Sequence, residues 1–193
     1  MSKKRPRHYQ WPPLPDNFTE TVPEGDNLER LVCDTCGFIN YINPKIVVGA
    51  VVAWQDRILM CRRDIEPRRG YWTMPAGFLE ERETVRDGAR REALEEAEAE
   101  IEVGALLAIY EIPRISQVQM FFRATLLSDD VGVGMETQEV AFFDFDDMPW
   151  DDLAFPTVTW ALKDYQKVAG QDDFAPFTTP DTKLGRRIAS GEL

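Results

Sequence analysis

The sequence predicts an α/β sandwich with a mixed β-sheet and a small ribbon-like β extension at the N-terminus. Three observations favour this fold. Residues 46–54 are rich in Val and Ile, as in a buried strand. Residues 84–97 carry small side chains at helical spacing, and further strand-like segments and a second helical segment follow.

The N-terminal part differs in composition from the rest of the chain. Residues 1–28 are polar and rich in Pro, which predicts an extended arm that packs through Trp11 and Phe18 or stays mobile. Residues 28–43 resemble a small β element that carries Cys33 and Cys36. We therefore assign residues 1–44 to an arm and a ribbon-like element.

A β-hairpin is expected next. Residues 46–54 form its buried strand, Gln55 and Asp56 form its turn, and residues 57–63 form its second strand. A turn at residues 68–70 then leads to the predicted helix.

The first helix is expected to begin at Thr84, which can act as its N-cap, with Asp87 in the first turn. Ala89, Ala93 and Ala97 recur every four residues and give this helix a flat face. Such a face allows the helix to approach a sheet closely.

The remaining segments complete the sheet and its second layer. Residues 101–111, 117–127 and 140–145 are predicted strands, and Pro156 precedes a helix at 157–169. We assign residues 45–169 to one domain and residues 170–193, which are polar and contain Pro, to a loosely held tail.

Composition excludes several classes of protein. The chain of 193 residues has a net charge of −12, which argues against binding to a nucleic-acid backbone. Its three cysteines indicate no disulfide framework, and no apolar run approaches the ~20 residues that a membrane helix needs. The basic start lacks an apolar segment behind it, so we expect a cytoplasmic protein.

Three carboxylates close together in the first helix carry the strongest chemical signal. Glu92 and Glu96 stand one turn apart on one helical face, with Glu95 beside them. Like charges at this spacing disfavour an isolated helix. A hard divalent cation such as Mg²⁺ or Mn²⁺ would offset that repulsion and could also bind substrate phosphates. The alternative is an acidic helix that only faces solvent.

Residues 77–99 also resemble the Nudix box, G-x5-E-x7-R-E-U-x-E-E-x-G-U, where U is aliphatic. The positions that match are Gly77, Glu83, Arg91, Glu92, Ala93, Glu95, Glu96 and Ala99. Glu98 departs from the pattern, because the family has a glycine there that ends the helix in a left-handed turn. With Glu98, the helix should run on slightly or end with strain. The resemblance covers roughly residues 45–169 and implies the Nudix-type α/β/α sandwich.

The resemblance implies a hydrolase that directs water at the P–O–P bridge of a nucleoside diphosphate linked to another group. Glu92, Glu96 and the backbone carbonyl of Ala76 would be metal ligands. Glu95 would be a shared ligand or the group nearest the attacking water. Gly77 would let the backbone approach the metal and substrate closely.

Two further box residues are expected to support these carboxylates. Arg91 lies four residues from both Asp87 and Glu95, so we expect it to orient catalytic carboxylates. Glu83 falls near the helix N-terminus, where a carboxylate is favoured, and is expected to give structural support.

Candidates outside the box rest on weaker patterns. In related enzymes the general base can lie on a loop before a late strand, which points to Glu139 with Glu136 behind it; a solvated loop carboxylate is the alternative. Arg62 and Arg63 could bind substrate phosphate bidentately. Trp72 and Phe121 could stack on the substrate's ring system, although aromatic residues beside strands often belong to the core.

Cys33 and Cys36 form half of a zinc ribbon. The adjoining Asn43, Pro44 and Lys45 resemble the Nudix subgroup that has an N-terminal ribbon, but the upstream cysteine pair is absent. We therefore expect the ribbon fold to persist through packing, without zinc. Zinc shared with His8, with Cys61 or across a dimer is the alternative.

The subgroup is associated with ADP-ribose and FAD pyrophosphohydrolysis, so these substrates are favoured. NADH or another dinucleotide is the alternative, because Ser116 and Gln117 match only part of the NADH diphosphatase signature. A nucleotide-sensing module that does not cleave is a second alternative, although all three box glutamates are present. The resemblance is also compatible with a homodimer.

Overall fold

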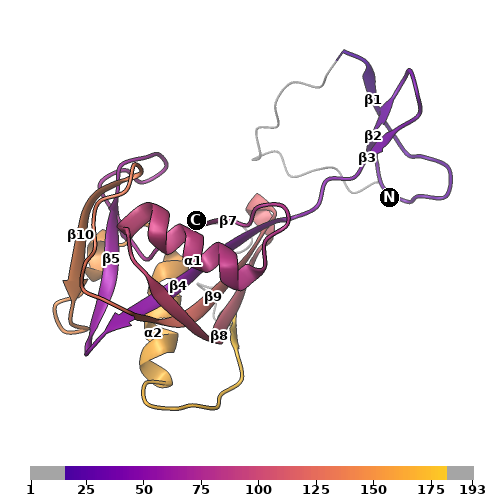
Figure 1. The fold of residues 1–193 in the computed structure, drawn as a ribbon. Coiled ribbons are helices and arrows are strands. Elements are labelled where there is room, and N and C mark those ends of the chain that lie inside the picture. Colours follow the sequence, from indigo (N-terminus) through magenta and orange to yellow (C-terminus); the bar gives the residue numbers. More distant parts are fainter. Residues whose placement is uncertain (1–15, 182–193) are drawn as a thin grey trace.

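The computed structural model describes residues 16–181, which form two sheets and two α-helices. The expected mixed α/β fold is confirmed (Figure 1). The larger sheet of this described part has strand order β10-β5-β4-β9-β8-β11, with β6 paired to β5 and β7 to β4. Its members are β4 (Lys45–Trp54), β5 (Arg57–Arg63), β6 (Trp72–Thr73), β7 (Ala76–Phe78), β8 (Ile101–Ile112), β9 (Gln117–Leu126), β10 (Thr137–Phe143) and β11 (Phe177–Thr178).

The sheet is mixed because most neighbours run antiparallel, while β4 pairs parallel with β9 and β8 pairs parallel with β11. Strands β4 and β5 form the expected hairpin around Gln55 and Asp56. Strand β7 pairs with the first half of β4, opposite residues 47–49. This pairing places the segment that precedes the first helix beside β4, a central strand of the sheet.

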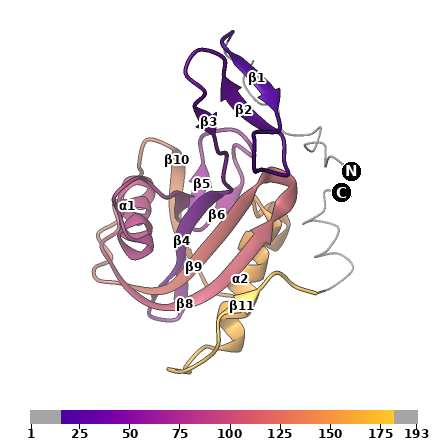
Figure 2. The same ribbon diagram turned by 90° about the vertical axis from the view of Figure 1, so that its right-hand side faces the viewer.

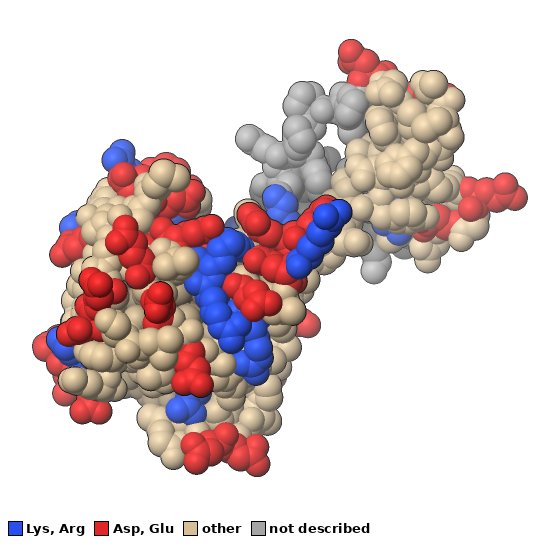
Figure 3. All heavy atoms as spheres, in the orientation of Figure 1, with Lys and Arg blue, Asp and Glu red and all other residues tan. Residues whose placement is uncertain are grey.

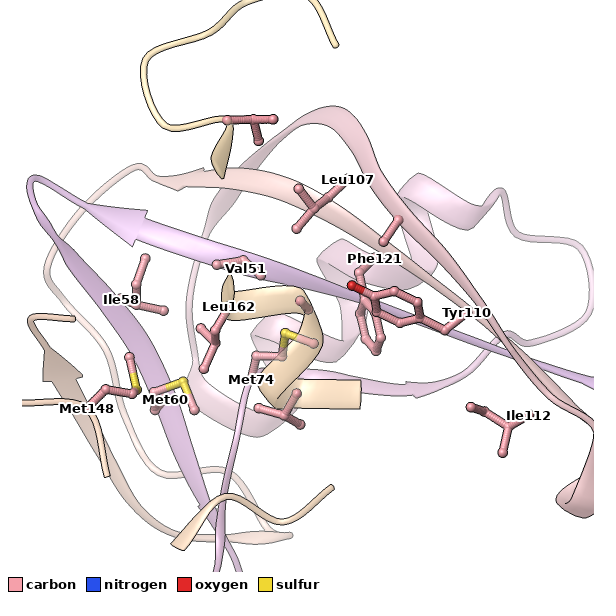
Figure 4. Packing of buried hydrophobic residues seen from close by; sticks show 14 residues of the cluster. Val51, Ile58, Met60, Met74, Leu107, Tyr110, Ile112, Phe121, Met148 and Leu162 are labelled. Atoms are coloured by element: carbon pink, nitrogen blue, oxygen red, sulfur yellow. The ribbon is translucent and has the colours of Figure 1, made fainter. Parts of the chain in front are cut away.

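The helices α1 (Val85–Ala97) and α2 (Pro156–Lys167) lie on opposite sides of the sheet, as Figure 2 shows. The alternation of side chains along β4 explains this arrangement. Ala50 and Val52 belong to the hydrophobic cluster that includes the alanine face of α1, whereas Val51 belongs to the cluster that includes α2. Figure 4 shows the α2-side cluster, with Val51 close to Leu162.

Helix α1 begins as the sequence predicts. Thr84 is the N-cap, and its hydroxyl accepts a hydrogen bond from the Asp87 backbone N–H. Ala89, Ala93 and Ala97 are fully buried against the sheet. The helix ends at Ala97, and Glu98 has the left-handed conformation with φ 49°. Of the two expected outcomes, a longer helix or a strained end, the strained end is observed, because a non-glycine residue takes the left-handed turn.

The N-terminal sheet consists of β1 (Phe18–Thr21), β2 (Arg30–Cys33) and β3 (Ile39–Asn40), all antiparallel. It lies apart from the larger sheet in Figure 1. Part of the expected arm, at Phe18, is therefore a strand, because its backbone pairs with β2. The predictions for Trp11 and His8 lie outside the described residues.

The cysteines occupy different environments. Cys33 is buried at the end of β2 and its sulfur accepts a long hydrogen bond from the Asn17 side chain, while Cys36 is exposed in the following turn. Cys61 is 1% exposed within the cluster beneath α1, so it belongs to the core between α1 and the larger sheet. Whether Cys33 and Cys36 bind a metal stays a prediction.

The main differences from the sequence expectations lie at β10 and in the expected tail. Strand β10 begins at Thr137 rather than Val140, and residues 177–178, expected in a loose tail, form edge strand β11. Thr179 strengthens this edge, because its hydroxyl accepts a hydrogen bond from the Glu111 backbone N–H. Neither α-helix within residues 16–181 combines the length and apolar character of a membrane span.

Candidate active site

The site lies where α1 faces β7. Glu92 and Glu96 project from one face of the helix, and both are buried, with 8% and 7% of their surface exposed. Glu95 lies on the exposed part of the same turn. The structure therefore brings together the two carboxylates that helical periodicity places on one face, and it keeps them in a low-dielectric setting.

Gly77 lies directly beneath Glu92. A Cβ atom on Gly77 would lie 2.3 Å from Oε2 and 2.5 Å from the carboxyl carbon of Glu92. Only a residue without a side chain allows the Glu92 carboxylate to occupy this position. The box glycine is thus explained by close approach to a catalytic candidate.

Glu96 contacts the same strand one residue earlier. Its Oε2 atom accepts a hydrogen bond of 3.0 Å from the Ala76 backbone N–H. Burial raises the pKa of Glu96 to about 8, and the negative charges of Glu92 and Glu136 act in the same direction. Burial likewise raises the pKa of Glu92, against the effect of Arg91. Both carboxylates are therefore poised to gain from a nearby cation.

Arg91 lies among the box carboxylates and hydrogen-bonds three of them. Its Nη1 atom donates to Glu92 at 2.7 Å and to Glu95 at 2.9 Å, and its Nη2 atom donates to the Phe78 carbonyl at 3.0 Å. Glu83 holds the other edge of the guanidinium. One guanidinium thereby ties three box glutamates to the strand that carries Gly77.

Glu83 lies in the loop before α1 and contacts both this loop and the helix. Besides Arg91, it accepts a hydrogen bond of 2.7 Å from the Glu80 backbone N–H. Gly88 in α1 leaves room for it, since a Cβ there would lie 2.9 Å from Oε1 of Glu83. Glu83 therefore fixes the loop before α1 as well as Arg91.

Glu139 was expected on the loop before the late strand, but the structure leaves only Glu136 on that loop. Glu139 lies within β10, opposite Arg62 of β5, and the two side chains form an exposed ion pair of 3.4 Å. Glu136 lies on the preceding loop, and its charge acts on both Glu92 and Glu96. The sequence estimate began the strand three residues too late; a strand from Thr137 would have pointed to Glu136.

The two arginines of β5 also differ in their surroundings. Arg62 contacts Glu139 and donates to the Gly70 carbonyl. Arg63 donates to the Pro67 carbonyl, lies 5.2 Å from the centre of the Phe155 ring, and its charge lowers the pKa of Glu96. Arg63 is consequently the better placed of the two for a phosphate near Glu96.

The aromatic candidates belong mainly to the core. Phe121 is 2% exposed and lies beside Tyr110, with 5.9 Å between ring centres (Figure 4). Its expected stacking on substrate is corrected, because a ring at this depth presents no face to a ligand. Trp72 is partly buried and packs edge-on against Phe143 at 5.0 Å, so its ring also has a structural partner.

The donor set fits a hard divalent cation. Glu92, Glu95, Glu96 and the Ala76 backbone offer oxygen ligands, which Mg²⁺ and Mn²⁺ prefer. Within residues 16–181, no three side chains of His, Cys, Asp or Glu already stand together as a metal cage. The Nη1 atom of Arg91 holds one oxygen of Glu92 and one of Glu95. Each of these carboxylates has a second oxygen that could bind a cation.

The face that carries α1 has mixed charge, and a hollow lies at the start of α2. Figure 3 shows acidic side chains over much of the face that carries α1, with a band of basic side chains among them. This mixed face lacks the continuous basic character of a nucleic-acid interface. An open hollow of about 380 Å³ lies at the start of α2, and its lining includes Arg68, Tyr71, Phe155 and Trp160.

Comparisons with known proteins agree with this geometry. Residues 43–162 match the NUDIX domain family, and residues 17–42 match the Nudix N-terminal family. The chain is 29% identical to the ADP-ribose pyrophosphatase of Methanocaldococcus jannaschii over 131 residues, which cover 66% of this chain and 76% of that protein.

Solved structures show the same fold. A NUDIX hydrolase from Nitrosomonas europaea superposes with a TM-score of 0.79 and 45% identity, covering 83% of this chain and 93% of that one. A bifunctional NMN adenylyltransferase/ADP ribose pyrophosphatase from Francisella tularensis, complexed with AMP and a Mn ion, has a TM-score of 0.58 and 17% identity. This second likeness covers 66% of this chain and 42% of that one, and it concerns the fold alone.

Proposed function

The chain belongs to the NUDIX domain family and is a Nudix pyrophosphohydrolase, and we propose that it cleaves a nucleoside diphosphate linked to another moiety with the help of Mg²⁺ or Mn²⁺. One observation carries this proposal: Glu92 and Glu96 lie buried on one face of α1, against the strand that carries Gly77. Buried carboxylates without enough positive charge gain most from a divalent cation.

Glu92 and Glu96 would hold the cation, with Glu95 and the Ala76 carbonyl completing its ligands. When bound, the cation would neutralise the diphosphate and lower the pKa of a coordinated water. Arg91 holds Glu92 and Glu95 in place through the hydrogen bonds described above. Positioning and charge compensation of this kind account for most of the catalysis in phosphoryl chemistry.

We assign the general base to Glu136, with Glu139 as the alternative. Glu136 is exposed and its charge reaches Glu92 and Glu96, so a water bound near those residues lies within its field. Glu139 is paired with Arg62 instead. A carboxylate that removes the proton of the attacking water typically raises the reaction rate by a factor of ~100 or more.

Matched variants separate these two candidates. Glu136→Gln should lower kcat by ~100-fold, while Glu139→Gln should change kcat by less than about threefold, because only the first removes a base from the site. Thermal unfolding should stay near the wild-type midpoint for both. The reverse order of the two kcat values would reassign the base to Glu139.

ADP-ribose is the favoured substrate, and FAD is the next. The similarity to an ADP-ribose pyrophosphatase supports the first. The hollow at the start of α2 could receive the aromatic end of either substrate, since Tyr71, Phe155 and Trp160 line it. Arg63, which lies 5.2 Å from the centre of the Phe155 ring and whose charge acts on Glu96, would contact the diphosphate.

A substrate panel tests the proposal. ADP-ribose, FAD, NADH and a nucleoside triphosphate are incubated with the protein and Mg²⁺ or Mn²⁺, and products are separated by chromatography. We expect AMP and ribose 5-phosphate from ADP-ribose, and no products with Glu96→Gln or without metal. Cleavage of NADH alone would favour the dinucleotide alternative. Tight nucleotide binding without any cleavage would indicate the sensing module.

A further inference from the structure

The loop between β9 and β10 is attached to the end of α1 by two glycines. We call residues 131–136 the docking loop. The Gly132 N–H donates to the Ala97 carbonyl at 2.9 Å, and the Gly134 N–H donates to the Glu96 carbonyl at 3.3 Å. Carbonyls in the last turn of a helix have no partner within the helix, so the docking loop supplies partners for two of them.

Of the two glycines, Gly134 lies closer to the backbone of α1. A Cβ atom at this position would lie 1.7 Å from the Glu95 carbonyl oxygen and 3.0 Å from the Glu96 Cα. Both contacts are with backbone atoms of α1, which cannot move aside as a side chain can. Gly134 is not among the residues with positive φ. Close approach alone therefore requires glycine here.

Gly132 provides an internal contrast. A Cβ atom there would lie 2.1 Å from Oε2 of Glu98 and 3.2 Å from its Cγ. These atoms belong to an exposed, flexible side chain, which can swing into solvent. An added methyl group should therefore be tolerated at Gly132 and not at Gly134, although both N–H groups bond to the same helix.

The other end of the docking loop is fixed to β5. The Glu136 carbonyl accepts a hydrogen bond of 2.8 Å from the Asp64 N–H, and the Thr137 N–H donates to the Gly134 carbonyl at 3.2 Å. Thr137 is 5% exposed, whereas Met135 is 97% exposed. The short segment between these anchors has little freedom, so the position of Glu136 depends on where Gly134 sits against α1.

We propose that Gly134 is a positioning residue: its direct contact with the last turn of α1 sets the place of Glu136 relative to Glu92 and Glu96. This inference rests on the proposed function, because it assigns to Gly134 the task of presenting the general base. On this proposal, Gly134, which lies far from the box in the sequence, determines the position of Glu136 in the site. Helix α1, which carries the proposed metal ligands, is the surface against which the docking loop is positioned.

The test compares Gly134→Ala with Gly132→Ala on the favoured substrate, ADP-ribose, with Mg²⁺. Displacement of a catalytic group by about 1 Å can cost ~100-fold, so Gly134→Ala should lower kcat by at least ~10-fold. Gly132→Ala should stay within about twofold of wild type, because Glu98 can move. The Mg²⁺ concentration for half-maximal activity should not change in either variant. Equal kcat values for Gly134→Ala and wild type would overturn the proposal.

A double-mutant cycle distinguishes positioning from general damage. If Gly134 acts through Glu136, then Gly134→Ala should have no further effect on kcat in a Glu136→Gln background. A purely structural defect would lower kcat by the same factor in both backgrounds. That additive result would contradict the proposal even if Gly134→Ala is slow.

Amide hydrogen exchange tests the docking without substrate and without a variant. In the wild-type protein, the Gly132 and Gly134 amides should exchange slowly, because both are hydrogen-bonded to α1. Exchange at the rate of an open loop would overturn the proposal, whether or not Gly134→Ala folds. Slow exchange in a protein that cleaves none of the substrates would refute the proposed function and, with it, the catalytic task of Gly134.

Discussion

Arg91 and Glu83 form a bidentate ion pair, in which Nη2 of Arg91 lies 2.8 Å from Oε1 of Glu83 and Nε of Arg91 lies 3.1 Å from Oε2 of Glu83. The pair joins the loop before α1 to the middle of the helix. It leaves Nη1 of the same guanidinium free to contact Glu92 and Glu95. This geometry needs the flat, multidentate guanidinium, which lysine cannot reproduce.

Arg91→Lys should therefore reduce both stability and turnover. The substitution removes most of these hydrogen bonds and leaves Glu92 buried with a weaker partner. We expect the free energy of unfolding to fall by about 2 kcal/mol in urea denaturation. Arg90→Lys is the matched control, because Arg90 pairs with Asp87 at the exposed surface and should cost less than about 0.5 kcal/mol. Equal losses for the two variants would contradict this view of Arg91.

Gly77→Ala tests the contact between the box glycine and Glu92. The new methyl group would overlap the Glu92 carboxylate and force it from the site. We expect kcat to fall by ~100-fold, because the displaced group is a proposed metal ligand. Circular dichroism should show a folded protein, since the methyl group meets only a side chain. Full activity in this variant would mean that Glu92 acts from another position.

The pH dependence of stability should report on Glu96 in the metal-free protein. Burial raises its pKa from the ordinary 4.5 to about 8, so the folded state holds the proton more tightly than the unfolded state. The resulting stabilisation is complete below the unfolded pKa and is lost as the pH rises through the folded pKa. The free energy of unfolding should consequently decline across this window.

Glu96→Gln is the control for this measurement. The glutamine side chain can still accept the Ala76 N–H, but it does not titrate. Denaturation at several pH values should show a weaker decline between about pH 5 and pH 8 for this variant than for wild type. Identical slopes would show that another group causes the dependence. Because the cation requires the ionised carboxylate, Mg²⁺ affinity of the wild type should rise over the same range.

Glu98→Gly should stabilise the protein. Glu98 occupies the left-handed turn after α1, a conformation that costs a non-glycine residue about 1 kcal/mol. Glycine removes this cost, so we expect the free energy of unfolding to rise by roughly 0.5–1 kcal/mol. Glu98→Ala keeps the backbone strain and should give no such gain. A stabilising effect of both variants would instead implicate the Glu98 side chain.

Local patterns in the sequence determined much of the fold. The Val/Ile run predicted β4, the alanines at four-residue spacing predicted the buried face of α1, and Thr84 predicted its start. The shared face of Glu92 and Glu96 followed from helical geometry. These features depend on neighbours within a few turns or strands, which is why one sequence was sufficient to predict them.

Features that depend on distant segments could not be predicted in the same way. Phe121 lies in a strand, but only the position of α2 shows which side chains of that strand are buried. Strand β11 is too short to be recognised until β8 provides its partner. The approach of Gly134 to α1 likewise joins residues that are far apart in the chain. The boundaries at residues 44 and 169, the homodimer and the cytoplasmic location stay predictions.

Binding of Mn²⁺ tests the central claim most directly. Free Mn²⁺ is followed by electron paramagnetic resonance during titration of wild type, Glu96→Gln and Glu98→Gln above pH 8, where Glu96 is ionised. We predict that Glu96→Gln weakens binding by at least ~10-fold, because it removes a ligand, while Glu98→Gln binds like wild type. If Glu96→Gln binds Mn²⁺ as tightly as the wild-type protein, the buried carboxylates of α1 are not the metal site.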